Sequence, residues 1–124
     1  MKVTFLGVGE AFDDDYTHTC ILVEAAGRRM LVDCGATAPP SVWHQSKRPD
    51  YLDGIFISHF HADHVFGLPA LMKRMEEDGR TRPFYLFGPV GSQRNIERLM
   101  EFAYPGMVAN LTFTLRFREL QRSH

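Results

Sequence analysis

The part of the sequence richest in chemically active side chains is the seven-residue run from Ser58 to His64. Three of the six histidines of the chain lie within six consecutive residues of this run, and an aspartate stands among them. The candidate ligands are His59, His61, Asp63 and His64. Neutral imidazole and carboxylate groups bind Zn²⁺ and similar first-row ions well. The run therefore predicts a metal site, in preference to a loop of unconnected surface histidines.

The spacing of these ligands favours two ions over one. Residues two apart on an extended segment point to the same side, so His59 and His61 can converge on one ion. Asp63 and His64, just past the expected bend, can face a second ion nearby. Two ions roughly 3.5–4 Å apart are a standard hydrolytic arrangement, because together they generate a hydroxide and stabilise the developing oxyanion. Mn²⁺ or Fe²⁺ would suit the same mixed ligand set as well as Zn²⁺ does.

Apolar strands are expected to hold this run in place. The segment 55–58 is apolar and leads directly into the histidines, and the segment 2–8 is apolar on both faces, which predicts a buried strand. Gly27 and Arg28 are typical of a hairpin turn between two further strands. The other expected strands are 20–23, 30–32, 84–87 and 111–117.

After the histidines the apolar spacing changes to that of helices. Two segments carry apolar residues at i, i+3, i+4 and i+7: Leu68, Leu71, Met72 and Met75, then Ile96, Leu99, Met100 and Ala103. Their methionines are expected in the core. We expect the first helix to stop near Gly79 and the second at Pro105-Gly106. A short helix should begin at Pro39-Pro40, with Trp43 on its inner face. Strands followed by alternating strands and helices predict an α/β layered domain.

Length and composition restrict the class of protein. A chain of 124 residues is one domain at most, and 14 basic against 15 acidic residues leave a net charge of −1. No long-range positive field would attract a polyanion. The apolar runs are shorter than the roughly 20 residues that cross a bilayer, and the N-terminus lacks the features of a secretory signal. With only two cysteines as well, we expect a cytoplasmic protein without a membrane partner.

The pattern His59-x-His61-x-Asp63-His64 resembles the signature of the metallo-β-lactamase-fold hydrolase superfamily. Its extended form, through Gly67-Leu68-Pro69, is most similar to the ribonuclease Z-like branch of that superfamily. Three further segments agree with this branch: 5–9, 31–35 and 87–89. The resemblance covers about residues 2–105. It implies an αβ/βα sandwich, of which this chain would form the first half, with a mixed sheet and helices on one face.

The resemblance also implies roles for individual residues. His59 and His61 would hold the first metal ion, and Asp63 and His64 the second, with Asp63 also orienting the attacking hydroxide. Asp33 would lie behind the metals, where it would align the ligands by hydrogen bonding. Ser58 and Gly67 would have backbone roles, with Gly67 allowing close approach of the loop to the site. A second interpretation of Asp33, as a turn residue that caps the end of a strand, remains open.

The sequence departs from the family pattern after His64. In relatives the remaining ligands come from a second half. Here the only histidine after His64 is the last residue, His124, which lacks the surrounding family motif. His18 opens an expected strand and His44 lies in a polar stretch at a helix end, so neither is expected to bind metal. We therefore expect a fragment or truncated product: a single partial domain over residues 1–124, which alone would bind metal weakly and be catalytically poor. Its uncovered sheet would favour self-association into a homo-oligomer.

Two functions are consistent with these observations. The first is a metal-dependent hydrolase that uses a dinuclear zinc site against a phosphodiester or other ester-like bond. Its substrate would be RNA or a small molecule. The acidic segment 10–15 stands where ribonuclease Z-like enzymes that process transfer RNA carry a basic loop, which favours the smaller substrate. The second is a non-catalytic metal-binding or interaction module, with the remaining ligands supplied by a partner chain.

Overall fold

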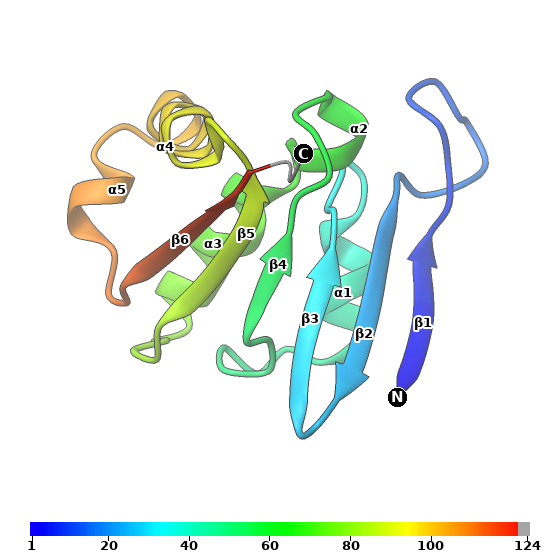
Figure 1. The fold of residues 1–124 in the computed structure, drawn as a ribbon, viewed down its shortest axis with the longest axis horizontal. Coiled ribbons are helices and arrows are strands. Elements are labelled where there is room, and N and C mark those ends of the chain that lie inside the picture. The colour runs from blue at the N-terminus through cyan, green and yellow to red at the C-terminus, as the bar shows by residue number, and fades with distance from the viewer. Residues whose placement is uncertain (122–124) are drawn as a thin grey trace.

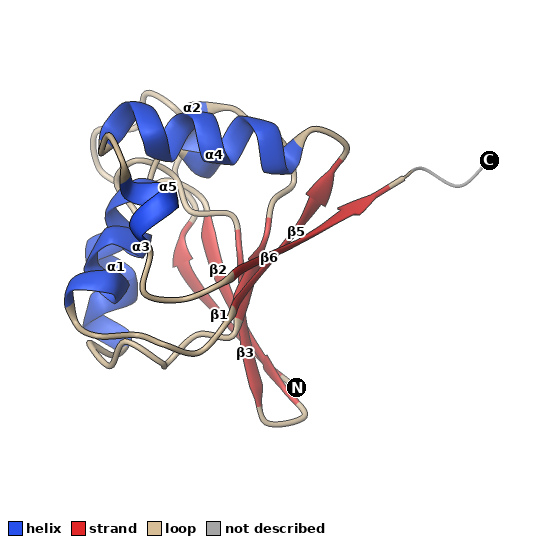
Figure 2. Cartoon of the chain, turned by 90° about the vertical axis from the view of Figure 1, so that its left-hand side faces the viewer, coloured by secondary structure: helices blue, strands red, loops and turns tan. Residues whose placement is uncertain are grey.

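A six-stranded mixed sheet forms the centre of the molecule, and the helices lie on one side of it (Figures 1 and 2). The computed structural model describes residues 1–121. The strands are β1 (Lys2–Gly7), β2 (Cys20–Ala25), β3 (Arg28–Val32), β4 (Gly54–Phe56), β5 (Phe84–Pro89) and β6 (Leu115–Leu120), and they lie side by side in chain order. β1 to β3 are antiparallel, whereas β3 to β6 run parallel. The expected α/β class with helices on one face is confirmed.

The helices connect the strands and cover one face. They are α1 (Pro39–Gln45), α2 (Ala62–Val65), α3 (Leu68–Glu77), α4 (Ser92–Ala103) and α5 (Met107–Asn110). Pro69 lies in the first turn of α3, where an amide hydrogen would lack a helical partner in any case. The chain leaves α3 through Gly79 at a φ of 89°. Both amphipathic helices are therefore confirmed, while the single turn α5 was not expected from the sequence.

The core lies between the sheet and the helices. Leu31, Ile55 and Leu86 stand in one row across β3, β4 and β5 because the strands pair in that register, and all three are buried. Apolar residues of α3 and α4 pack over this row: Leu68, Leu71, Met72, Met75, Ile96 and Met100. The expectation that the methionines in these helices are core residues is confirmed.

The N-terminal strand is not buried as expected. β1 pairs only with β2 and forms the edge of the sheet, so most of its side chains face solvent. Phe5, for example, is 67% exposed. The apolar pattern over 2–8 predicts a strand buried on both faces, but Val3 and Phe5 lie in the same rows as Met30 and Phe56, on the sheet face that no helix covers.

Two other expectations need correction. The final strand begins at Leu115 and not at residue 111, because its pairing with β5 starts opposite Phe84. Phe113 is buried ahead of the strand. In α1, Val42 is the buried anchor, whereas Trp43 is only partly buried.

The face of the sheet opposite the helices is also apolar. Met30, Phe56, Tyr85 and Phe87 lie on this face, where Tyr85 and Phe87 stack with ring centroids 6.4 Å apart. A shallow hollow of about 410 Å³ lies among Met30, Tyr85, Phe87 and two charged neighbours, Arg28 and Asp53. Self-association through this face stays a prediction.

A buried arginine joins the loops at the opposite end of the sheet from α2. Arg80 is 1% exposed and donates hydrogen bonds to four backbone carbonyls, those of Pro49, Leu52, Arg82 and Pro83, at 2.8–2.9 Å. Burial lowers the pKa of its guanidinium to about 10, which leaves the group charged at neutral pH. The arginine therefore supplies the hydrogen-bond donors that these four carbonyl groups need.

Candidate metal centre

The histidine run lies at the carboxyl end of the parallel part of the sheet. Asp33 follows β3 directly, and Ser58 comes two residues after β4. These strands are parallel neighbours with Val32 opposite Phe56, so the side chains of Asp33 and Ser58 lie at the same end of the sheet, the carboxyl end of its parallel strands. The Asp33 amide continues the pairing by donating to the Phe56 carbonyl at 2.9 Å. Ligand sites of open α/β sheets lie at this carboxyl end.

Asp33 accepts three hydrogen bonds beneath the histidines. Its Oδ1 accepts from the Ser58 amide at 2.8 Å, and its Oδ2 accepts from the Ser58 hydroxyl at 2.6 Å and from Nδ1 of His64 at 2.7 Å. The residue is 2% exposed. Its φ of 59° is in the left-handed region, which aspartate adopts more readily than most residues. The carboxylate is thus held in a fixed orientation against His64.

The structure brings the four candidate ligands together. The ring centroids of His59 and His64 are 4.0 Å apart, and those of His59 and His61 are 4.7 Å apart. Oδ2 of Asp63 lies 3.3 Å from Nε2 of His64. His61 precedes the first turn of α2, and this turn carries Asp63 and His64. One short segment therefore brings three imidazoles and a carboxylate into pairwise proximity at the carboxyl end of the sheet.

The donor chemistry of His64 and Asp63 fits a shared cation. A neutral His64 that donates its Nδ1 hydrogen to Asp33 keeps a lone pair on Nε2, and this lone pair faces Oδ2 of Asp63 at 3.3 Å. Two electron-rich atoms at this distance repel each other unless a positive charge lies with them. Two ligands each roughly 2.0–2.2 Å from one zinc ion would stand about this far apart. The pair therefore suits a metal ion, or a proton in its place.

The ligand set is not a closed metal site. Within residues 1–121, no group of three or more His, Cys, Asp and Glu side chains is already arranged around one metal position. The expected assignment places two ligands on each ion, which is fewer than the four of a complete zinc shell. The arrangement therefore leaves open positions toward solvent.

Backbone contacts fix the histidine segment against the segment that follows Asp33. The Cys34 amide donates to the His64 carbonyl at 2.7 Å, and the Gly67 amide donates to the Cys34 carbonyl at 2.9 Å. A β-carbon on Gly67 would lie 2.3 Å from the Gly35 carbonyl oxygen, and one on Gly35 would lie 2.2 Å from the Asp63 carbonyl oxygen. The close approach expected at Gly67 is confirmed. Gly35 has the same role, which the sequence reasoning did not assign to it.

The two contacts of the Ser58 hydroxyl were also not predicted from the sequence. The sequence suggested only a backbone role, but Oγ lies 2.6 Å from Asp33 and 2.9 Å from Nδ1 of His59. A hydroxyl group immediately before a histidine ligand was the available signal.

Of the remaining histidines that the structure describes, neither belongs to the cluster, although His18 packs against Gly35 next to the Asp63 backbone. His18 is buried before β2, and its amide donates to Thr37. His44 is exposed in the last turn of α1. His124 lies beyond residue 121.

The cysteine next to Asp33 is poorly suited to metal binding. Cys20 and Cys34 are free and fully buried. A hydrogen bond with the Cys20 thiol and burial raise the pKa of Cys34 well above its ordinary value. Because the thiolate is the form that binds metal, this thiol is a weak candidate.

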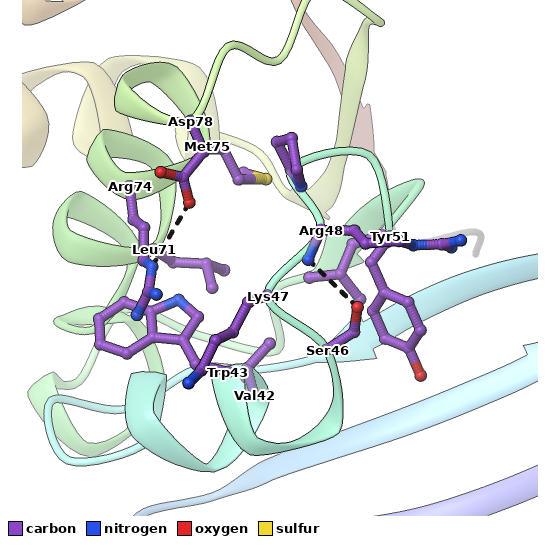
Figure 3. Close-up of a pocket in the computed structure, with 12 residues that line it drawn as sticks. Val42, Trp43, Ser46, Lys47, Arg48, Tyr51, Leu71, Arg74, Met75 and Asp78 are labelled. Carbon is purple, nitrogen blue, oxygen red and sulfur yellow. Dashed lines mark hydrogen bonds and ion pairs between the residues drawn. The ribbon is translucent and has the colours of Figure 1, made fainter.

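A small cavity lies away from the histidines. It is a crevice of about 20 Å³ between α1 and α3, where the Arg74 guanidinium lies 4.6 Å from the centre of the Trp43 ring and 3.5 Å from the Asp78 carboxylate (Figure 3). This volume holds little more than one water molecule. The crevice is too small for a substrate.

Solved structures with similar folds place the chain in a known class. Human tRNase Z, short form, superposes with a TM-score of 0.81 at 30% identity, over 99% of this chain and 47% of that chain. The metallo-β-lactamase fold protein YhfI from Bacillus subtilis superposes with a TM-score of 0.74 at 18% identity, over 98% of this chain and 46% of that chain. The fold is therefore that of the first part of metallo-β-lactamase-fold proteins, and the chain is ribonuclease Z-like.

Sequence comparison agrees and identifies the family. Ribonuclease Z of Methanococcus maripaludis strain C7 is 36% identical over 84% of this chain and 34% of its own length. Ribonuclease Z of Bacillus cereus strain B4264 is 33% identical over 90% of this chain and 39% of its own length. The family model described as Anti-Pycsar protein Apyc1 matches residues 1–98, so the chain belongs to that family. The chain spans about a third of the length of these curated relatives and about half of the solved structures.

Proposed function

We propose that this chain contributes His59, His61, Asp63 and His64 to the two-metal centre of a phosphodiester hydrolase. The observation that carries the proposal is the convergence of these four side chains at the carboxyl edge of the sheet, with Asp33 bonded to His64 at 2.7 Å. Similarity to proteins named Ribonuclease Z supports phosphodiester chemistry. Ions at this position would lower the pKa of water and stabilise charge on a scissile phosphate.

Within this proposal the residues of the chain have distinct tasks. Asp33 orients His64 and Ser58, while Asp63 would share a cation with His64 and would direct the attacking water. Zn²⁺ suits the mixed ligands, and Mn²⁺ or Fe²⁺ would also suit them. The exposed edge gives a substrate access to the cluster.

The acidic loop between β1 and β2 favours a small substrate. Its segment 10–15 lies at the same end of the sheet as α2 (Figure 1). Amide hydrogen bonds from Tyr16 and Asp15 lower the pKa of Asp13, which keeps this carboxylate charged. Negative charge here repels a long RNA backbone more than a compact ester with a single phosphate.

A specific observation also favours a second function. Because no three-ligand metal position is formed within residues 1–121, the chain would act as a non-catalytic metal-binding module if a partner had to complete each ligand shell. This alternative requires metal binding but predicts no hydrolysis by the chain on its own.

Hydrolysis of bis(p-nitrophenyl) phosphate with added Zn²⁺ or Mn²⁺ separates the two functions. Metal-dependent cleavage that is lost in Asp63→Asn and kept in His44→Gln, a change at an exposed histidine outside the cluster, would support the hydrolase. Metal binding without cleavage would favour the module, and absence of binding would contradict both. Faster cleavage of a precursor transfer RNA than of the small diester would contradict the small-substrate assignment.

A further inference from the structure

We infer that Ser58 is a positioning residue that passes the orienting effect of Asp33 to His59, so that one buried carboxylate sets the tautomers of two histidines. The inference deepens the proposed metal-dependent function and rests on it for its purpose. The tautomers themselves are properties of the metal-free chain.

Asp33 acts directly on His64 through a hydrogen bond. Oδ2 of Asp33 lies 2.7 Å from Nδ1 of His64. A carboxylate only accepts hydrogen bonds, so Nδ1 must carry the hydrogen. The lone pair of neutral His64 is then on Nε2, the atom that faces Asp63.

Asp33 acts indirectly on His59, through the single hydroxyl hydrogen of Ser58. The hydroxyl has a single hydrogen, and its Oγ lies 2.6 Å from Oδ2 of Asp33 and 2.9 Å from Nδ1 of His59. The hydrogen goes to the carboxylate, which can only accept. Oγ can therefore only accept from His59, which requires a hydrogen on Nδ1 of His59. The lone pair of His59 is likewise placed on Nε2.

A backbone hydrogen bond holds Ser58 in the position from which its hydroxyl makes both contacts. The Ser58 amide donates to Oδ1 of Asp33 at 2.8 Å, which holds the serine main chain against the same carboxylate. Asp33 is itself 2% exposed and cannot turn toward solvent. Since the hydrogen bond made by one ring nitrogen decides which nitrogen is free to bind metal, this anchoring selects Nε2 at both histidines.

Long-range ¹H–¹⁵N spectra of the imidazoles in the metal-free chain test the inference, at a pH where the rings are neutral. We expect Nδ1–H at His59 and His64, and Nε2–H, the form preferred in water, at exposed His44, which serves as the internal reference. Ser58→Ala should convert His59 to Nε2–H and leave His64 unchanged, whereas Ser58→Thr should retain the wild-type pattern.

Zinc affinity provides a second readout. Ser58→Ala should bind Zn²⁺ roughly 10-fold or more weakly than wild type, as expected when a group that orients a metal ligand is removed, and Ser58→Thr should restore binding. Nε2–H at His59 in the wild type, or an unchanged His59 in Ser58→Ala, would overturn the inference, and the wild-type spectrum decides even if the alanine variant does not fold. The predicted tautomers without zinc binding would leave the inference standing and remove the proposed function.

Discussion

Oδ2 of Asp33 lies 2.7 Å from Nδ1 of His64, and the two residues are 31 positions apart in the chain. The contact exists because β3 and β4 are parallel neighbours whose carboxyl ends meet, and because a backbone hydrogen bond joins Cys34 to His64. The sheet thereby holds a rigid carboxylate beneath a histidine-rich loop. Such an arrangement fixes ring orientation before any ligand arrives, which reduces the free energy needed to order a metal site.

Replacing Asp33 with asparagine tests the importance of this contact. Asparagine tolerates the left-handed backbone of this position, so the main chain should be kept. Its amide has one acceptor oxygen where the carboxylate has two, so at least one of the three donors loses its partner. We expect Asp33→Asn to bind Zn²⁺ about 10–100-fold more weakly by calorimetric titration. An unchanged affinity in a folded variant would show that the carboxylate only caps the end of β3.

Gly67→Ala should weaken both folding and metal binding. The added methyl group would lie 2.3 Å from the Gly35 carbonyl oxygen and 2.9 Å from the Cys34 carbonyl oxygen. Backbone atoms must shift to admit it, at a cost of about 1–3 kcal/mol in the free energy of unfolding. The shift displaces the segment that carries Asp33, so zinc affinity should fall as well.

Gly27→Ala is the matched control for this change. Its β-carbon would meet no atom within 4 Å, but the position has a φ of 75°. It should cost about 1–2 kcal/mol through backbone strain alone and leave zinc affinity unchanged. Equal effects of the two substitutions on zinc affinity would contradict the role assigned to Gly67.

How much of this structure the sequence predicts depends on whether a feature involves residues close together or far apart in the sequence. The helical spacing of Leu71, Met72 and Met75 is local, so α3 was predicted correctly. The histidine run could be predicted as a cluster because its members are adjacent in sequence. The position of β1 at the edge, in contrast, depends on which strands are neighbours, and no local pattern contains that information. The contact of Ser58 with Asp33 and the close approach of Gly35 to Asp63 were missed for the same reason, since each joins residues far apart in the chain.

The thiol of Cys34 should be unreactive in the native chain. Its hydrogen bond with Cys20 and its burial raise its pKa, and both thiols are fully covered. The thiolate is the reactive form, so labelling by iodoacetamide at pH 8 should require unfolding. We expect both cysteines to react only in denaturant, as followed by mass spectrometry. Rapid labelling of Cys34 under native conditions would contradict the burial of the segment behind the site.

Arg80→Met should strongly destabilise the fold. The change removes the donor for the carbonyl groups of Pro49, Leu52, Arg82 and Pro83. Unsatisfied buried carbonyls cost about 1–3 kcal/mol each, so urea unfolding should show a loss of roughly 3 kcal/mol or more. Arg94→Met, at an exposed position of α4, should stay within about 0.5 kcal/mol of wild type. Similar losses in both variants would show that Arg80 contributes no more than a surface arginine.

No helix within residues 1–121 has the length and apolar character needed to span a bilayer. Large apolar side chains that are exposed in the described residues lie in several places, among them Phe56 on the sheet face opposite the helices, Phe12 between β1 and β2, and Phe102 on α4.

Titration of the chain with Co²⁺, followed by visible absorption, tests the central claim most directly. Cobalt replaces zinc at nitrogen and oxygen ligands, and its visible bands report on the ligands that it binds. We expect saturable bands in the wild type and in His44→Ala. We expect their loss in a variant that combines His59→Ala with His64→Ala. Absence of bands in the wild type, or equal bands after both ligands are removed, would contradict a metal centre at the carboxyl edge of the sheet.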